Sequence, residues 1–139
     1  QRAELDMTIF FRRLAQVDVE APNLAILSPA FYRPDLVEAY RDELEAWLAA
    51  WAARVKAAAE ADSLRVARMN AANPKYVLRN YLAQQAIDRA ERGDVGMVHD
   101  LLEVMRHPYD EQPGNERYAE RRPDWAREKP GCSMLSCSS

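Results

Sequence analysis

Two cysteines near the carboxyl end are the side chains of this chain best suited to covalent chemistry. Cys132 and Cys137 are separated by Ser-Met-Leu-Ser, in a stretch from Gly131 onward that carries no charge. A thiol reacts as its thiolate and only where it is accessible, so Cys137, third from the end, is the better placed nucleophile. Closing so short a loop contributes little stability, and a bond between the two would be a redox device or an artefact rather than a structural crosslink. Two inert thiols are the alternative interpretation.

The remaining candidates for acid, base or metal chemistry favour structural roles. His99 and His107 lie on neighbouring helical turns without a third ligand, whereas zinc needs several ligands at close spacing. Asp110 and Glu111 stand between two prolines, where adjacent carboxylates are typical turn formers or ion-pair partners rather than an acid/base pair. We therefore expect no metal site and no catalytic residue here.

Nucleotide chemistry has no motif in this sequence. Phosphate-binding loops need glycines at fixed spacings, and the four glycines form neither G-x-G-x-x-G nor G-x-x-x-x-G-K. The lysines at positions 56, 75 and 129 lack the context of a kinase-like site. A net charge of −3 with both signs interspersed argues against nucleic-acid binding, and no apolar stretch is long enough for a membrane span. We expect no cofactor-binding residue in the chain.

Hydrophobic periodicity near 3.6 residues predicts helices almost throughout. A short connector after the first helix is expected to hold one helical turn near residues 24–27. The Asn73-Pro74 pair predicts a cap and a first helical residue, Gly93 predicts the stop of that helix, and Asp94 predicts the cap of the next. The expected helices cover approximately residues 5–17, 34–61, 63–69, 74–92 and 95–107.

These elements predict an all-α fold of four to five helices with a bundle-like arrangement. The expected organisation is a helical domain over 1–107, followed by an extended, irregular, Pro-rich tail over 108–139 that holds both cysteines. The last helix is expected to bury Val98, Leu101, Leu102 and Met105. Because the chain starts with Gln1 rather than Met and residues 3–7 already have a helical pattern, we expect an excised fragment or an internal domain boundary. Two cysteines without a secretory signal indicate a reducing compartment, and we expect a cytoplasmic protein.

Four stretches resemble the carboxyl-terminal end of the selenoprotein O family. The residues that carry the resemblance are Asn73-Pro74-Lys75-Tyr76-Val77-Leu78-Arg79-Asn80, Pro108–Pro113, Pro123-Asp124-Trp125-Ala126 and Pro130-Gly131-Cys132-Ser133. The region 35–66 is generic helix and adds little. The resemblance covers most of the chain and is uneven along it.

The resemblance implies a parent protein with a kinase-like (pseudokinase) fold that transfers AMP from ATP, with Mg²⁺ or Mn²⁺, onto Ser, Thr or Tyr of protein substrates. No ATP or metal ligand of that site falls on a residue of this chain, so the catalytic domain would lie upstream and act as the partner of this helical module. Cys137 stands where animal members carry selenocysteine, which implies a redox role, with Cys132 or an upstream cysteine as its partner. Tyr76, Arg79 and Asn80 are the candidates for docking onto the catalytic domain.

Two other functions remain open from the sequence. A free-standing helical protein-interaction domain would leave Cys137 an ordinary thiol, whereas a redox-regulatory tail predicts a specific disulfide or a Cys137 that titrates below an ordinary cysteine. A standalone thiol oxidoreductase is disfavoured because no C-x-x-C stands at a helix start. The target proteins and the oligomeric state are not encoded in any motif.

Overall fold

The chain folds into helices that form two compact units. The computed structural model describes residues 4–129, 131 and 132. Contacts divide the chain into Gln1–Pro74, here unit 1, and Lys75–Ser139, here unit 2. Within the described residues there is no strand, and a single isolated antiparallel bridge joins Leu5 to Phe31. The predicted all-α class is confirmed.

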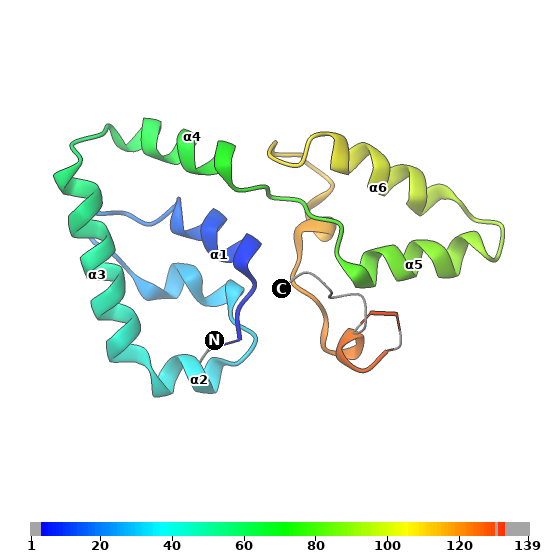
Figure 1. The fold of residues 1–139 in the computed structure, drawn as a ribbon, viewed down its shortest axis with the longest axis horizontal. Helices are drawn as coiled ribbons and strands as arrows, with labels where there is room; N and C mark the ends of the chain where they lie inside the picture. Colours follow the sequence, from blue (N-terminus) through cyan, green and yellow to red (C-terminus); the bar gives the residue numbers. More distant parts are fainter. Residues whose placement is uncertain (1–3, 130, 133–139) are drawn as a thin grey trace. The chain divides into compact units, whose positions relative to one another are not determined.

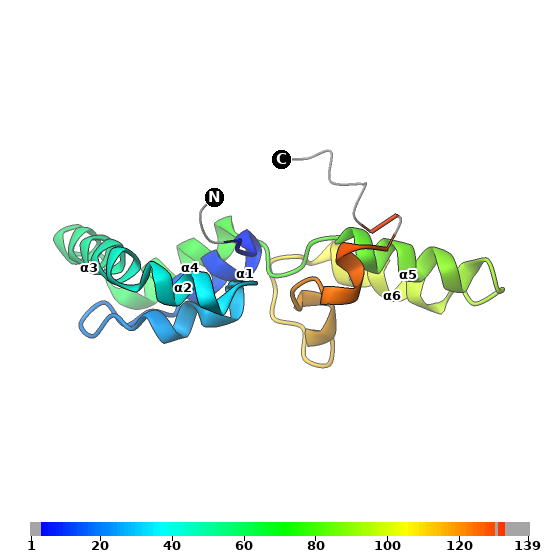
Figure 2. The ribbon, with the colours of Figure 1, turned by 90° about the horizontal axis from the view of Figure 1, so that it is seen from below.

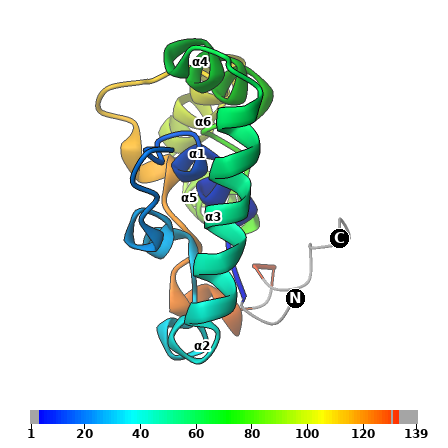
Figure 3. The same ribbon diagram turned by 90° about the vertical axis from the view of Figure 1, so that its left-hand side faces the viewer.

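Unit 1 is built around α1 and a 3-10 helix that lie side by side (Figure 1). α3 runs from α2 at one end to α4 at the other (Figure 3). The helices of unit 1 are α1 (Met7–Leu14), η1 (Leu24–Ala30), α2 (Pro34–Ala39), α3 (Arg41–Ala57) and α4 (Asp62–Ala72). Their buried core consists of Leu14, Val17, Leu24, Leu27, Phe31 and Leu48. η1 confirms the helical turn expected near residues 24–27.

α1 begins at Met7, two residues later than the pattern predicted, because Asp6 caps it. The Asp6 Oδ1 atom accepts a hydrogen bond of 3.1 Å from the Ile9 amide. The Asp6 amide donates to the Ala30 carbonyl at 2.7 Å, which ties the start of α1 to the end of η1. A side-chain oxygen at this position satisfies an amide that has no partner within the helix.

The single long helix predicted over 34–61 is wrong, because the structure divides it at Tyr40. Tyr40 has φ −116° and ψ 20°, outside the helical range, and α3 starts at the following residue. Arg41 bridges the break through Glu38 at 2.5 Å and Glu45 at 3.4 Å. Ala59, at φ 51°, lies just beyond the other end of α3. The spacing of apolar residues indicates which side of a segment is buried. A break of one residue changes that spacing very little, so the sequence pattern did not reveal the break at Tyr40.

Two buried arginines, Arg65 and Arg12, connect the helices of unit 1. Arg65 is 1% exposed and donates to Asp62 Oδ1 at 2.6 Å and to the Val17 carbonyl at 3.2 Å. Its guanidinium carbon lies 5.5 Å from the centroid of the Trp51 ring. Asp62 is therefore engaged with Arg65 and does not cap α4, whose N-cap is Ala61 without a side-chain bond.

The other end of α4 is closed by polar groups from two parts of unit 1. Arg12 donates to the carbonyls of Asn70 and Asn73 at 3.3 and 3.4 Å, and the Asn73 amide group donates to the Met69 carbonyl at 2.7 Å. A cation that binds the last carbonyls of a helix is favourable there. Asn73 thus ends α4, whereas the sequence predicted that it would start the next helix.

Unit 2 contains a helical hairpin, visible in Figure 2, formed by α5 (Asn80–Ala90) and α6 (Gly96–Arg106). Gly93 adopts φ 87° in the connection, and Asp94 Oδ1 accepts from the Gly96 amide at 2.9 Å. The stop predicted at Gly93 is thus confirmed. The N-cap of α6 is Val95, without a side-chain bond, so the cap predicted at Asp94 is wrong, and Asp94 instead forms a turn one residue earlier. The hydrogen bond from the Gly96 amide, followed by Arg89, lowers the pKa of Asp94.

The start of α5 differs from the prediction by several residues. The amides of Lys75 and Tyr76 donate to the Pro108 carbonyl at 2.7 and 3.0 Å, so this segment pairs with the chain beyond α6 instead of coiling. The helix begins only at Asn80, with Arg79 in an extended conformation as its N-cap. Long-range pairing has overridden a local start signal.

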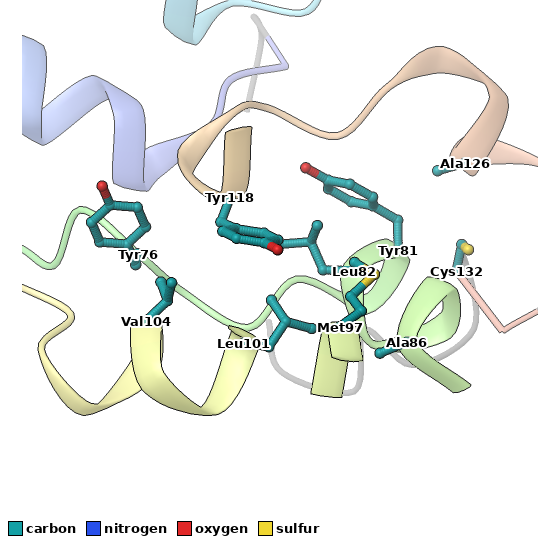
Figure 4. Close-up of a cluster of buried hydrophobic side chains, with 10 residues drawn as sticks. All are labelled: Tyr76, Tyr81, Leu82, Ala86, Met97, Leu101, Val104, Tyr118, Ala126 and Cys132. Carbon is teal, nitrogen blue, oxygen red and sulfur yellow. The ribbon is translucent and has the colours of Figure 1, made fainter. Parts of the chain in front are cut away.

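The segment beyond α6 supplies part of the core of unit 2. It contains η2 (Glu116–Ala119) and η3 (Asp124–Arg127) in an otherwise irregular path. The buried cluster, shown in Figure 4, joins this segment to both helices and comprises Tyr76, Tyr81, Leu82, Ala86, Met97, Leu101, Val104, Tyr118, Ala126 and Cys132. Contacts divide the chain after Pro74, whereas the predicted boundary between 107 and 108 separates helix-rich from Pro-rich sequence; that boundary stays a prediction.

Replacement of Leu48 with Ala should destabilise unit 1 strongly. Leu48 is 1% exposed in the core, so truncation removes buried methyl groups and leaves a cavity, at a cost of about 2–5 kcal/mol. Leu64→Ala is the matched control, because Leu64 is 62% exposed and its loss should change stability by roughly 0.5 kcal/mol or less. Denaturant unfolding of both variants measures the difference. Equal effects would contradict this assignment of the core.

Candidate functional site

Cys132, one of the two predicted thiols, lies in the hydrophobic core of unit 2. It is a free thiol, 3% exposed, in the cluster that includes Ala86 and Ala126 (Figure 4). A thiol in such surroundings behaves as a small apolar side chain, and reagents reach it only when the structure opens. Cys137, the predicted redox partner, lies outside the described residues.

Four residues, here called the latch, hold the segment around Cys132 on α5: Gln84, Asp88, Lys129 and Gly131. Lys129 Nζ lies 2.5 Å from Asp88 Oδ2, and the Gln84 side-chain amide donates to Asp88 Oδ1 at 2.7 Å. The pKa of Asp88 is lowered first by the hydrogen bond from Lys129 and then by the one from Gln84. The hydrogen bond with Asp88 raises the pKa of Lys129. Both side chains are charged at any pH between the pKa of Asp88 and the pKa of Lys129, and the two shifts widen that pH range. The pair therefore stabilises unit 2 across neutral pH and is lost as Asp88 protonates in acid or Lys129 deprotonates in alkali.

Gly131 allows the close approach that the latch requires. Its φ is +83°, and a Cβ atom there would lie 2.2 Å from Gln84 Oε1. Gln84 is held by Asp88, so it cannot turn away without losing that hydrogen bond. Glycine at this position is thus required by the backbone conformation and also by the space.

Trp125 closes the same region from the solvent side. Its ring meets that of Tyr81 edge-on with centroids 6.2 Å apart, and Lys129 Nζ lies 5.8 Å from its centroid. The Tyr81 hydroxyl donates to the Glu120 carbonyl at 3.3 Å. Cation, aromatic and hydrogen-bond contacts therefore hold residues 120–129 on α5.

The three residues predicted to dock occupy different environments. Tyr76 is 1% exposed, with its ring in the core of unit 2 and its hydroxyl donating to the Gln112 carbonyl at 3.3 Å. Arg79 and Asn80 lie at the start of α5 and are half-buried. The docking role stays a prediction for all three. Substituting Tyr76 would disturb the core of unit 2, so only Arg79 and Asn80 can report on docking by itself.

The remaining polar candidates take part in surface interactions. Glu111 pairs with Lys75 at 2.5 Å, which confirms the ion-pair role predicted for this carboxylate. His107 Nδ1 lies 3.6 Å from Asp110 Oδ2, and both side chains are exposed. Across residues 4–129, 131 and 132, no group of three His, Cys, Asp or Glu side chains is arranged to hold a metal ion.

Sequence reasoning missed the latch of Gln84, Asp88, Lys129 and Gly131. Gln84 and Asp88 are spaced i, i+4 on α5, a spacing that brings side chains together and that periodicity could have indicated. Their partners are some 40 residues later in an irregular segment, as the separation of 41 between Asp88 and Lys129 shows. No local pattern connects positions so far apart.

These features define a helical protein in which the described polar side chains mainly form ion pairs and hydrogen bonds that hold the helices together. No helix of the described part is long and apolar enough to cross a membrane. A comparison with protein-family models finds no match.

Bacterial relatives of the chain are named protein nucleotidyltransferase YdiU. The chain is 59% identical over 138 residues to that of Aromatoleum aromaticum, covering 99% of this chain and 26% of the relative. It is 58% identical to that of Tolumonas auensis and 54% identical to that of Xanthomonas campestris pv. campestris, covering all of this chain and 27% of each relative. The chain thus spans about a quarter of the length of the relatives that it matches. These relatives are of the selenoprotein O/YdiU family, and the chain is homologous to a portion of them, in agreement with the resemblance seen in the sequence.

Replacement of Gly131 with Ala should loosen the latch. The substitution strains a backbone at positive φ, which costs roughly 1–2 kcal/mol, and it also displaces Gln84 from Asp88. Gly114→Ala is the matched control, since Gly114 has φ +90° with nothing within 4 Å of its Cβ position. We expect Gly131→Ala to be the more destabilising by about 1 kcal/mol, the value of one hydrogen bond.

Thermal unfolding compares the two glycine variants, and the rate of thiol labelling at Cys132 in the native state reports on the opening of the latch. Labelling should be faster in Gly131→Ala than in Gly114→Ala. Equal stabilities and equal labelling rates would contradict the role assigned to the close approach.

Proposed function

We propose that the chain is the carboxyl-terminal helical module of an ATP-dependent protein adenylyltransferase. The catalytic, kinase-like part of that protein lies outside this chain and transfers AMP to Ser, Thr or Tyr of protein substrates. Its ATP and its Mg²⁺ or Mn²⁺ are bound there, and the protein acts in the cytoplasm. The observation that carries the proposal is the identity of 54–59% along essentially the whole chain to proteins named nucleotidyltransferases, of which it spans only 26–27%.

Two features of the chain support this division of labour. The sequence has no glycine-rich phosphate loop and no lysine in a kinase-like context. Charged side chains in the described residues form ion pairs that stabilise the fold, such as Arg65 with Asp62 and Lys129 with Asp88. The module would therefore contribute stability and surface rather than reacting groups.

The proposal assigns the redox role in this part of the protein to Cys137. Cys132 is 3% exposed, so its thiol reacts only when unit 2 opens. A disulfide between Cys137 and Cys132 therefore requires the latch to open, and the proposed partner of Cys137 is an upstream cysteine. Arg79 and Asn80 are the proposed docking residues that can be substituted without removing a core side chain.

The test is transfer of label from α-labelled ATP, with Mg²⁺ and with Mn²⁺, to the protein itself and to added protein substrates. We expect transfer by the full-length protein and none by this chain alone. Addition of reductant should change the rate of the full-length protein, and Cys137→Ser should remove that response. Arg79→Ala should lower the rate, with the exposed Arg54→Ala on α3 as control.

Each other outcome of this assay has a defined meaning. Transfer by the isolated chain would contradict the separation of module and catalytic part. Transfer by neither protein would overturn the adenylyltransferase proposal and favour a helical protein-interaction domain. A reductant response that persists in Cys137→Ser would remove the redox role from that thiol.

A further inference from the structure

α6 carries a second apolar face that unit 2 does not bury. Val95 is 49%, Val98 42% and Leu102 51% exposed. Val95 is the N-cap of α6, and the spacing of i, i+3 and i+7 places Val98 and Leu102 on the same side of the helix as this residue. The three form one row, here the 95–102 ridge. The sequence predicted that Val98 and Leu102 would be buried with Leu101, and the structure shows that this was wrong. The residues of α6 that are buried are Met97, Leu101 and Val104.

The exposure of the ridge does not arise from fraying, because α6 is held at several points. Arg89 and Asp94 form an ion pair at 2.7 Å in the connection before α6. Asp100 accepts from the Tyr118 hydroxyl at 3.1 Å in the middle of the helix. The Gln112 side-chain amide donates to the carbonyls of Val104 and His107 at 3.0 and 2.8 Å at its end. The ridge is thus presented in a fixed orientation.

The chemistry of the ridge suits another protein surface. Its members are aliphatic and branched, and rows with this spacing pack into the grooves of a second helix. Next to it α6 carries polar side chains, including the Glu103–Arg106 ion pair at 2.9 Å. An apolar centre with a polar rim is typical of surfaces that become buried in protein contacts.

We propose that the 95–102 ridge docks onto the part of the same protein that lies outside this chain. The argument for this occupant is length: the relatives are about four times as long as the chain, which covers 26–27% of them. The proposal deepens the function proposed above and rests on it, because it names the surface through which the module meets the catalytic part. A second copy of the protein is the competing occupant and is one outcome of the test.

The test measures thiol accessibility in the full-length protein. Val98→Cys is compared with His99→Cys, the neighbouring exposed position, which points about 100° away around the helix. Both variants are treated with a maleimide under native conditions, and labelling is followed for the 98–99 peptide by mass spectrometry, which separates it from Cys132 and Cys137. We expect Cys at 98 to react at least ~10-fold more slowly than Cys at 99, because a docked ridge reacts only when it opens.

A second pair of variants keeps the test decisive if the first does not fold. Leu102→Cys takes the place of Val98→Cys, and Glu103→Cys is its neighbouring control. Equal labelling of ridge and control positions would overturn the proposal. Slow labelling that becomes fast on dilution would assign the ridge to a second copy and would also overturn it.

The outcome is separable from that of the transfer assay. Slow labelling of the ridge in a protein that transfers no AMP would support the docking surface and reject the adenylyltransferase proposal. Equal labelling in a protein that does transfer AMP would reject the docking surface alone.

Discussion

Burial of Tyr118, Ala126 and Cys132 against the α5–α6 hairpin is the contact on which unit 2 depends. A hairpin of two 11-residue helices has only one shared surface, and helices of that length are marginal without tertiary packing. The segment after α6 supplies the third side of the core. At its start, the Pro108 carbonyl accepts hydrogen bonds from the amides of Lys75 and Tyr76. An irregular, proline-rich stretch is therefore structural rather than an appended tail.

That packing also determines what chemistry the cysteines can perform. The latch from Lys129 to Asp88 and the close approach of Gly131 to Gln84 place the Cys132 thiol inside the core. A burial equilibrium thus links the stability of unit 2 to any reaction of Cys132.

The sequence predicted the features that depend on near neighbours. The all-α class and the turn at Gly93 follow from local periodicity and local backbone preference, and the structure confirms them. The start at Asn73-Pro74 failed because Asn73 closes the preceding helix and the next residues pair with Pro108. The latch was beyond reach for the same reason, since its members are brought together only by the tertiary fold. The face of α6 was misjudged because both of its sides are apolar, and periodicity alone does not say which side the hairpin buries.

The most direct test of this account is amide hydrogen exchange in the full-length protein and in a variant that lacks residues 108–139. If those residues complete the core of unit 2, the amides of α5 and α6 lose their protection in the truncated protein. The amides of α1, α3 and α4 keep theirs, because unit 1 has its own core. Unchanged protection of α5 and α6 after truncation would contradict the central claim and would show that the helical hairpin is stable without the segment that follows it.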